Sequence, residues 1–174
     1  IVRSAFTGGE PIAPYISSFG VDLFLSKNEE DVRTVFASGA AASALLLEPP
    51  ETLNEDTSTV RIAFDADAVL FSEISERIYQ TEGLEAFAAH ELQQVEVPLP
   101  EGPHAKLLHT LSRVQELIRQ HQGEPSPLRI AIVTARSGPS HLRVIHTLRA
   151  WHVAVDEAFF LGGVSKAQVL KSFR

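Results

Sequence analysis

Two aspartates follow an alternating apolar run, and their type and spacing could support chemistry on a phosphate. The run places Val60, Ile62 and Phe64 at every second position and ends in Asp65 and Asp67. Alternation with a period of two predicts a β-strand. Because open α/β sheets bind ligands beyond the carboxyl ends of their strands, we expect both carboxylates to lie in a ligand crevice.

The two carboxylates suit different steps of one reaction. Asp65 could act as a nucleophile that forms an aspartyl-phosphate. Asp67 could give a proton to the leaving oxygen and later take one back. Together with a carbonyl oxygen, the pair could also hold Mg²⁺, which prefers oxygen ligands. The alternative is that both aspartates are only turn and cap residues after a buried strand.

A second stretch could bind the phosphate itself. The strand Arg129–Val133 is followed by Thr134, Ala135, Arg136 and Ser137, and then by a predicted helix. Helix N-termini present free N–H groups to anions, and hydroxyl and guanidinium groups donate to phosphate. The alternative is that Thr134 or Ser137 caps the helix while Arg136 is solvated.

Three further polar residues follow predicted strands. Lys166 lies after Gly162-Gly163 near a helix N-terminus, where a cation opposes the helix dipole, so a partner such as Asp65 is favoured. Thr7 and Asn28 could contact substrate from the rim. The alternatives are a solvated surface lysine, and ordinary turn and N-cap roles for Thr7 and Asn28.

The order of apolar runs predicts an α/β fold, a Rossmann-like parallel sheet with helices on both faces. Residues 1–71 and 125–174 would form this core, and residues 72–124, which contain no convincing strand, would be an inserted α-helical cap. Within the cap, the helix over 106–122 has Leu107, Leu108, Leu111, Val114, Leu117 and Ile118 on one face. The expected strands cover 1–6, 21–25, 42–47, 60–65, 129–133 and part of 153–161, and the expected helices cover 11–19, 29–38, 75–80, 84–94, 106–122, a segment from Pro139 to about 151 and a segment from Ser165.

Composition excludes several classes of protein. The 174 residues carry a net charge of −7, which gives no basic surface for nucleic acid. No cysteine is present, so no disulfide framework can form. We expect no membrane segment, because no apolar run is long enough to span one. The seven histidines show no metal-binding spacing. The chain begins at Ile1 and contains no methionine, so we expect a fragment or a processed product.

The combination of Asp-x-Asp, Thr and Lys, each after a strand, resembles the haloacid dehalogenase superfamily of phosphatases. The segment FDADAVLFSEISERI is similar to FDGDAVLFSDESERI of the cytosolic 5′-nucleotidase I family. The segments VDLFLSKNEEDVRTVFASGAAAS and VTARSGPSHLRVIHTLRAWHVAVDEAFFLGGVSKAQVL also resemble that family, as does the helical insertion. The likeness covers nearly the whole chain.

The resemblance implies a hydrolase that converts nucleoside 5′-monophosphates to nucleoside and phosphate in the cytoplasm. It implies that Asp65 is the nucleophile and a Mg²⁺ ligand, and that Asp67 is the acid/base and gives its carbonyl to the metal. Thr134 would bind the transferring phosphoryl group and Lys166 would neutralise charge. The helical cap would shape the nucleoside pocket, and assembly as a homo-oligomer is compatible with this assignment.

The chain departs from the family pattern in three places. Ala66 stands where the family has glycine, a modest change if the φ angle there is negative. Glu73-Ile74 replaces an Asp-Glu pair. The family places a further acidic pair on the strand after the lysine, whereas this sequence ends at Arg174, so we expect a metal ligand to be missing. Two alternatives stay open at this point: a phosphatase for another small phosphoester, and a nucleotide-binding fragment without turnover.

Overall fold

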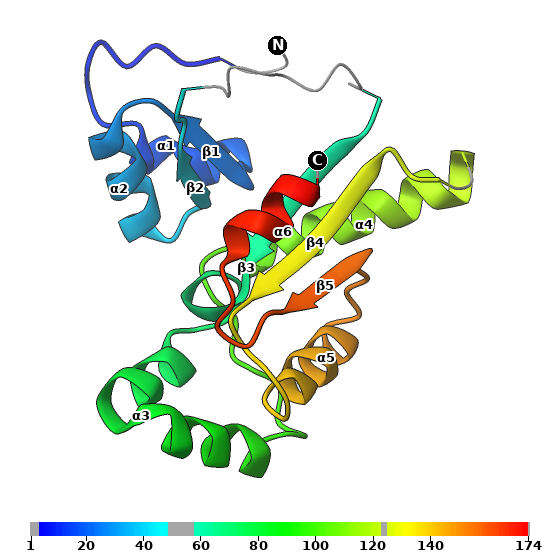
Figure 1. The fold of residues 1–174 in the computed structure, drawn as a ribbon. Coiled ribbons are helices and arrows are strands. Elements are labelled where there is room, and N and C mark those ends of the chain that lie inside the picture. Colours follow the sequence, from blue (N-terminus) through cyan, green and yellow to red (C-terminus); the bar gives the residue numbers. More distant parts are fainter. Residues whose placement is uncertain (1–3, 49–57, 123–124, 174) are drawn as a thin grey trace. The chain divides into compact units, whose positions relative to one another are not determined.

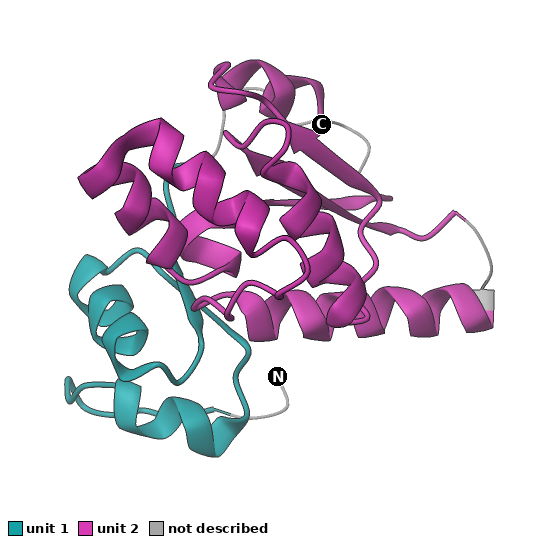
Figure 2. Cartoon of the chain, turned by 90° about the horizontal axis from the view of Figure 1, so that it is seen from below, with its two compact units in different colours: residues 1–53 teal, residues 54–174 magenta. Residues whose placement is uncertain are grey.

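The computed structural model describes residues 4–48, 58–122 and 125–173. It divides into two compact units, Ile1–Leu53 and Asn54–Arg174, which Figure 2 colours separately. This division passes through the predicted core segment 1–71. The boundaries proposed for core and cap are therefore not those of the compact units, and they stay a prediction.

The second unit is built on a three-stranded parallel sheet. The strands are β3 (Val60–Asp65), β4 (Leu128–Thr134) and β5 (Glu157–Phe160), and they lie side by side in the order β3-β4-β5 (Figure 1). Asp65 pairs with Val133, and Thr134 pairs with Phe160. Strand β4 is central and almost wholly buried, as its continuous apolar sequence requires.

Helices cover both faces of this sheet. Successive side chains of a strand point to opposite faces, so Phe159 and Phe160 of β5 mark the two sides. Phe160 contacts the ring of His141 in α5 (His141–Ala150), with 5.4 Å between ring centroids. Phe159 lines one cavity together with Val169 of α6 (Lys166–Ser172). The predicted α/β architecture, a parallel sheet with helices on both faces, is confirmed.

Helix α4 (Ala105–Gln122) runs along the sheet and leads back to β4. Its Leu108 is fully buried, and the side chain of Gln115, also fully buried, donates to the carbonyl oxygen of Leu128 at 2.8 Å. Arg119 pairs with Asp156 at 3.0 Å, just before β5. These contacts fasten α4 to the ends of β4 and β5 that lie opposite Asp65 and Thr134.

The segment between β3 and α4 leaves the sheet through a short helical turn, η2 (Ala66–Leu70), and then forms α3 (Ile74–Gln93). The predicted helices over 75–80 and 84–94 are joined in α3, with a kink at Gly83, whose φ is 88° and ψ is −178°. Only glycine adopts this conformation readily, so the glycine at position 83 permits the kink.

The first unit is a small βαβ arrangement. Its elements are α1 (Ala13–Ile16), η1 (Ser17–Phe19), β1 (Leu23–Ser26), α2 (Glu29–Ser38) and β2 (Ala42–Leu45), with β1 parallel to β2. Val35 is fully buried and packs with Ala13, Ile16 and Ala41. Helix α2 begins as predicted, because the side chain of Asn28 accepts hydrogen bonds from two backbone N–H groups of its first turn.

Two local predictions are wrong. The strand expected over 1–6 lies partly outside the described residues, and residues 4–6 form no strand. The helix expected from Pro139 begins at His141, because residues 138–140 form a turn in which Ser140 Oγ donates to the carbonyl oxygen of Ser137 at 2.8 Å. The second error lies at the end of an element, where local hydrogen bonds compete with regular structure.

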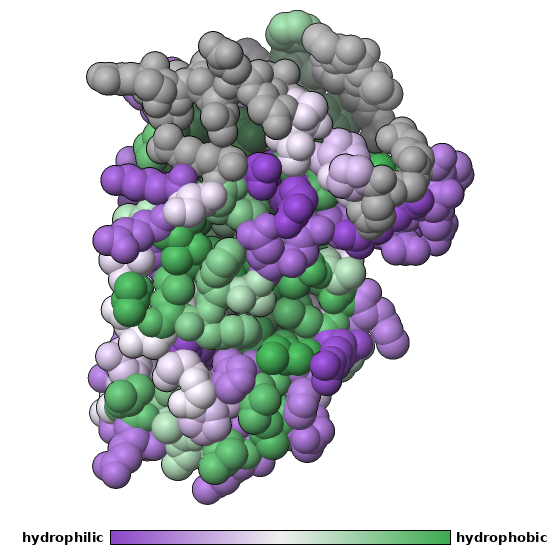
Figure 3. All heavy atoms as spheres, turned by 45° about the vertical axis from the view of Figure 1, so that its right-hand side comes forward, coloured by the Kyte–Doolittle hydropathy of each residue, from purple (hydrophilic) through white to green (hydrophobic). Residues whose placement is uncertain are grey.

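Across the described ranges, neither α3 nor α4 nor any shorter helix has the length and apolar character needed to cross a membrane. Apolar and polar side chains mix over the face drawn in Figure 3. Several large apolar side chains of α3 are exposed, among them Tyr79 and Leu84.

Gly102 is the tightest glycine in the structure, and replacing it should lower stability. A methyl group there would lie 2.5 Å from the carbonyl oxygen of Phe71 and 2.6 Å from that of Val69. We expect Gly102→Ala to reduce the free energy of unfolding by about 1–3 kcal/mol, the usual cost of overpacking. Thermal unfolding followed by circular dichroism measures this. Gly138→Ala is the control, because its nearest side-chain atoms would lie at 3.6 Å, and an equal loss in both variants would contradict the steric explanation.

Candidate active site

The carboxyl ends of β3 and β4 bring the predicted catalytic residues together. Asp65 is the last residue of β3 and Thr134 is the last residue of β4, its neighbour in the sheet. Lys166 is the first residue of α6, which follows β5. Parallel strands end at the same edge of a sheet. Each of the three residues ends or follows one of these strands, so their side chains lie together at that edge.

Asp65 and Lys166 form an ion pair. The Nζ atom of Lys166 donates to Oδ2 of Asp65 at 2.6 Å, although 101 residues separate the two in sequence. The backbone N–H of Ala66 donates to Oδ1 of Asp65 at 2.8 Å. The side chain of Asp65 is 45% exposed and that of Lys166 is 34% exposed. The carboxylate is therefore oriented from two sides and still open to a ligand.

An unusual backbone conformation carries Asp67 toward Thr134. Within η2, Asp67 has φ −72° and ψ 136°, and Ala68 has φ 58°. A left-handed alanine is strained, and such strain tends to gather at functional sites. Thr134 Oγ1 donates to Oδ2 of Asp67 at 3.4 Å, and it accepts from the backbone N–H of Arg136 at 3.1 Å. Ala66 is not among the residues with positive φ, so the glycine of the family pattern is not required there.

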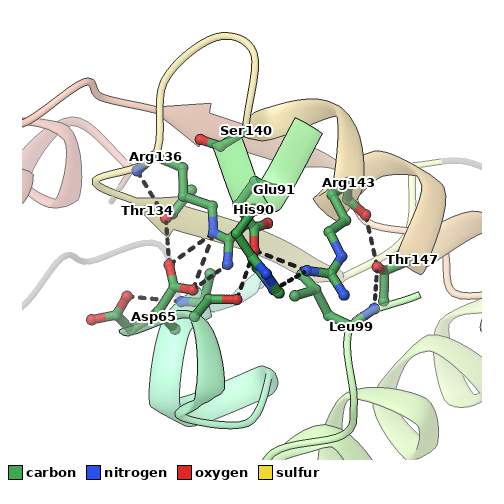
Figure 4. Close-up of polar contacts among 12 residues, drawn as sticks. Asp65, His90, Glu91, Leu99, Thr134, Arg136, Ser140, Arg143 and Thr147 are labelled. Carbon is green, nitrogen blue, oxygen red and sulfur yellow. Dashed lines mark hydrogen bonds and ion pairs between the residues drawn. The ribbon is translucent and has the colours of Figure 1, made fainter. Parts of the chain in front are cut away.

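Arg136, which Figure 4 shows beside Thr134, contacts Asp67 through its guanidinium group. Its Nε atom lies 3.1 and 3.0 Å from the two carboxylate oxygens of Asp67, and its Nη2 donates to Oδ1 at 2.6 Å. The side chain of Arg136 is 2% exposed. Burial by itself lowers the pKa of Arg136, but hydrogen bonds and charge from Asp67 and Glu91 outweigh it and raise that pKa. The guanidinium is therefore charged whenever the protein is folded.

A buried carboxylate on α3 completes the cluster. Glu91, whose side chain is 0% exposed, accepts from Nη1 of Arg136 and, at 2.9 Å, from Nη1 of Arg143 in α5. Ser75 Oγ also donates to Glu91, at 2.8 Å. The ring of Phe87 lies 5.2 Å from Cζ of Arg136. Ser75 belongs to the half of α3 before the kink and Glu91 to the half after it. Both halves of α3 are thus linked to the site through the Glu91 carboxylate.

The charges of the cluster balance. Its carboxylates belong to Asp65, Asp67 and Glu91, and its cations belong to Lys166, Arg136 and Arg143. A buried ion pair is tolerated when its geometry is good and its remaining hydrogen-bonding groups are satisfied. An incoming phosphate would add negative charge where Asp65 and Lys166 are exposed, and a bound cation would offset that charge.

The residues present fit a Mg²⁺ ion in part. Over residues 4–48, 58–122 and 125–173, no group of three or more His, Asp or Glu side chains is arranged to hold a metal. Asp65 and Asp67 supply hard oxygen atoms, and Mg²⁺ is often held by one or two carboxylates together with waters and substrate phosphate. The carboxylate of Asp65 and the backbone carbonyl oxygen of Asp67 could therefore provide the few protein ligands that Mg²⁺ accepts. The carboxylate oxygens of Asp67, both contacted by Arg136, are not needed for it.

The remaining predicted substrate residues fall into two groups. Ala135 and Ser137 are exposed on either side of buried Arg136, in the loop after β4. Asn28 and Thr7 belong to the first unit, where Asn28 caps α2 and the carbonyl oxygen of Thr7 accepts from the backbone N–H of Glu10 at 3.1 Å. Contacts of these residues with substrate stay predictions. Arg136, expected to bind phosphate, instead binds Asp67 and Glu91 in this structure.

Sequence reasoning missed Glu91, Arg143 and Ser75. Each looks like an ordinary polar residue on an amphipathic helix, and burial of charge is uncommon enough that exposure is the natural expectation. The available signal was Gly83, which predicts a break in α3 and so a change in the face that points inward.

The comparisons with known proteins identify the family of this chain. A family model described as 5′-nucleotidase matches residues 1–174. The chain is 34% identical to cytosolic 5′-nucleotidase 1B of Homo sapiens over 176 residues, which cover 100% of this chain and 29% of that protein. No solved structure matches the chain significantly. The family match extends over every residue that forms the site, and the chain belongs to the 5′-nucleotidase family.

Proposed function

We propose that this chain carries the catalytic site of a Mg²⁺-dependent 5′-nucleotidase, which hydrolyses nucleoside 5′-monophosphates through an aspartyl-phosphate on Asp65. One observation carries the proposal: Lys166 donates to Asp65 at 2.6 Å beside the strand end where Thr134 donates to Asp67. Family membership supplies the substrate class.

In the first half of the reaction, an Oδ atom of Asp65 attacks phosphorus and the bond from phosphorus to the nucleoside O5′ breaks. Asp67 is ionised in the cluster described above, so it first takes up a proton. It then gives that proton to O5′, and the nucleoside leaves as a neutral alcohol. Lys166 and the hydroxyl group of Thr134 donate to the phosphoryl oxygens, where negative charge is concentrated in the transition state.

In the second half, water attacks the phosphorus of the aspartyl-phosphate. Asp67 is now ionised and takes a proton from that water, and the bond between phosphorus and Asp65 breaks. Inorganic phosphate leaves, Asp65 is again a carboxylate, and Asp67 is again protonated. Arg136 holds Asp67 in place throughout, since its guanidinium contacts both carboxylate oxygens.

Mg²⁺, held by Asp65 and Asp67, would supply positive charge that lets an anionic nucleophile approach an anionic phosphate. The resident cations, Lys166 and Arg136, are each paired with a carboxylate and cannot fully supply that charge.

Helix α3 is our candidate for the cap. It follows the catalytic strand directly, it contacts the site through Glu91, and it exposes the large apolar side chains of Tyr79 and Leu84. Such side chains could cover a nucleoside and exclude water from the phosphate. The relative that the chain matches is named as cytosolic, and we extend a cytoplasmic location to this protein as part of the proposal.

The direct test is phosphate release from a panel of nucleoside 5′-monophosphates and sugar phosphates, with and without Mg²⁺. Because the chain spans 29% of its relative, the assay uses both this chain and any longer polypeptide that contains it. Release from nucleoside monophosphates that requires Mg²⁺ supports the proposal. Preference for sugar phosphates would indicate another phosphatase, and nucleotide binding without release would indicate a binding module.

Lys166→Met should lower kcat roughly 10²–10³-fold, as loss of one donor to a transition-state oxyanion does. Methionine keeps the length and apolar stem of lysine but removes the charge that contacts Asp65. Steady-state phosphate release measures the effect, and Lys171→Met, in the same helix, serves as the control. Equal activity in the two variants would exclude Lys166 from the reaction.

A further inference from the structure

We propose that Glu91 is a positioning residue for Asp67, and that it acts through Arg136. The inference rests on the proposed function, because it assigns a role to a residue that supports the acid/base group. The juxtaposition that carries it is a chain of contacts, from Glu91 to Arg136 and from Arg136 to Asp67.

Arg136 is a rigid link between the two carboxylates. Guanidinium is planar, with its donors in a fixed fork, so fixing one end fixes the direction of the other. The Nε and Nη2 atoms of Arg136 contact Asp67, and Nη1, at the other corner of the group, contacts Glu91. With only Asp67 as a partner, the guanidinium could follow that side chain instead of holding it.

Glu91 is itself held firmly. Its Oε1 atom accepts from Ser75 Oγ at 2.8 Å and from Nη1 of Arg143 at 2.9 Å, which leaves Oε2 for Arg136. Arg143 is fixed in turn, because its Nε donates to the carbonyl oxygen of Val97 at 2.9 Å. Ser75 and Arg143 therefore fix the Oε1 atom of the Glu91 carboxylate, and its Oε2 atom contacts Arg136.

Stability alone does not account for a buried carboxylate at this place. A buried charge loses its hydration, and buried ion pairs often stabilise a fold no better than apolar side chains of the same volume. Glu91 has no exposed side-chain surface, and its arginine partners are 2% and 6% exposed. The arrangement does offer directional control of Arg136, which apolar packing could not provide.

The consequence for the reaction is specific to the leaving group. A nucleoside leaves as an alkoxide unless Asp67 protonates it, whereas p-nitrophenolate leaves readily without a proton. Loss of positioning at Asp67 should therefore slow formation of the aspartyl-phosphate from a nucleoside monophosphate and spare its formation from p-nitrophenyl phosphate. The later attack of water is the same for both substrates, so the comparison uses kcat/KM, which reports only the steps up to release of the leaving group. General damage to the fold or to the nucleophile would slow both.

The test compares kcat/KM for the two substrates in Glu91→Gln and in the wild-type protein. Glutamine keeps the size of glutamate and removes its charge. We expect kcat/KM for the nucleoside monophosphate to fall at least about 10-fold, within the range that acid–base catalysis can contribute, and kcat/KM for p-nitrophenyl phosphate to change less than about 3-fold. Equal losses for both substrates would overturn the positioning role.

Two further variants sharpen the test. Asp156→Asn is the matched control: Asp156 is another largely buried carboxylate, 12% exposed, that accepts from Gln115 at 2.6 Å and Arg119 at 3.0 Å at the opposite end of the sheet. It should leave the ratio of the two kcat/KM values unchanged. In an Arg136→Lys background, which removes the fork, Glu91→Gln should change that ratio no further. An undiminished effect in this background would show that Glu91 does not act through Arg136.

Should Glu91→Gln fail to fold, Ser75→Ala tests the same carboxylate, because it removes the hydrogen bond from Ser75 Oγ to Oε1 of Glu91. We expect a smaller change of the ratio in the same direction, and an unchanged ratio would overturn the proposal. A wild-type protein that hydrolyses neither substrate would overturn the proposed function and this inference with it. Activity in the wild type with equal losses in Glu91→Gln would overturn the inference only.

Discussion

Asp65→Asn should abolish phosphate release, with a fall in kcat of roughly 10⁴–10⁶-fold, the scale seen when a member of a catalytic nucleophile unit is removed. The amide is isosteric with the carboxylate but is a poor nucleophile toward phosphorus. It also loses the charge that pairs with Lys166 at 2.6 Å. Initial rates of phosphate release from a nucleoside monophosphate measure the change.

The fold should survive this substitution. The ion pair of Asp65 is partly exposed, and exposed pairs contribute about 0–1 kcal/mol to stability. Asn can still accept from the backbone N–H of Ala66. Thermal unfolding close to that of the wild type would show that the loss is chemical, and near-normal phosphate release from Asp65→Asn would refute the nucleophile assignment.

Asp67→Asn should lower kcat for nucleoside monophosphates by about 10²–10⁴-fold, the usual contribution of general acid–base catalysis. Asparagine can accept from Arg136 but has no carboxyl proton to give. The value of kcat/KM for p-nitrophenyl phosphate, whose leaving group needs no proton, should fall much less than kcat/KM for the nucleoside monophosphate. The ratio of the two kcat/KM values isolates proton transfer to the leaving group, because kcat/KM does not include the later attack of water.

The control for Asp67→Asn is Arg136→Lys, which keeps a cation beside Asp67 but removes the planar fork. It should change the same ratio in the same direction and by a smaller factor. A loss of both activities to the same extent in Asp67→Asn would indicate a structural or metal-related role, and the acid/base assignment would have to be abandoned.

The strand-end residues could be predicted because the signals for them are local. Period-two alternation ended at Asp65, a continuous apolar run ended at Thr134, and Gly162-Gly163 preceded the cap of the helix that begins with Lys166. Parallel topology then places the strand ends at one edge, so three segments far apart in sequence were expected together. The structure contains contacts between these strand ends: Lys166 donates to Asp65, and Thr134 donates to Asp67.

The faces of the helices could not be predicted as well. The apolar residues of α4 suggested one buried face, yet Val114 and Leu117 are exposed, while Gln115 is fully buried. Gln115 bonds to the carbonyl oxygen of Leu128 and to Asp156, and those partners belong to distant segments. Helix propensity and apolar periodicity contain no information about such distant partners. The hydrogen bonds of Gln115 therefore helped to determine which face of α4 is buried, and the spacing of apolar residues could not predict this.

The same limit applies to Arg136, whose contacts with Asp67 and Glu91 were not foreseen and whose contact with phosphate stays a prediction. An arginine after a strand can bind phosphate or carboxylate equally well, because both present oxygen atoms to its fork. The choice depends on Glu91, which reaches the site only through the fold of α3 after its kink at Gly83.

The central claim is that Asp65 becomes phosphorylated. The most direct measurement is to quench the protein during turnover of a nucleoside monophosphate with Mg²⁺, to reduce the acyl phosphate with borohydride, and to examine the peptide around Asp65 by mass spectrometry. We predict reduction of Asp65 to homoserine, which depends on substrate and is absent from Asp65→Asn. Turnover with an unmodified Asp65, or with the label on another residue, would contradict the mechanism.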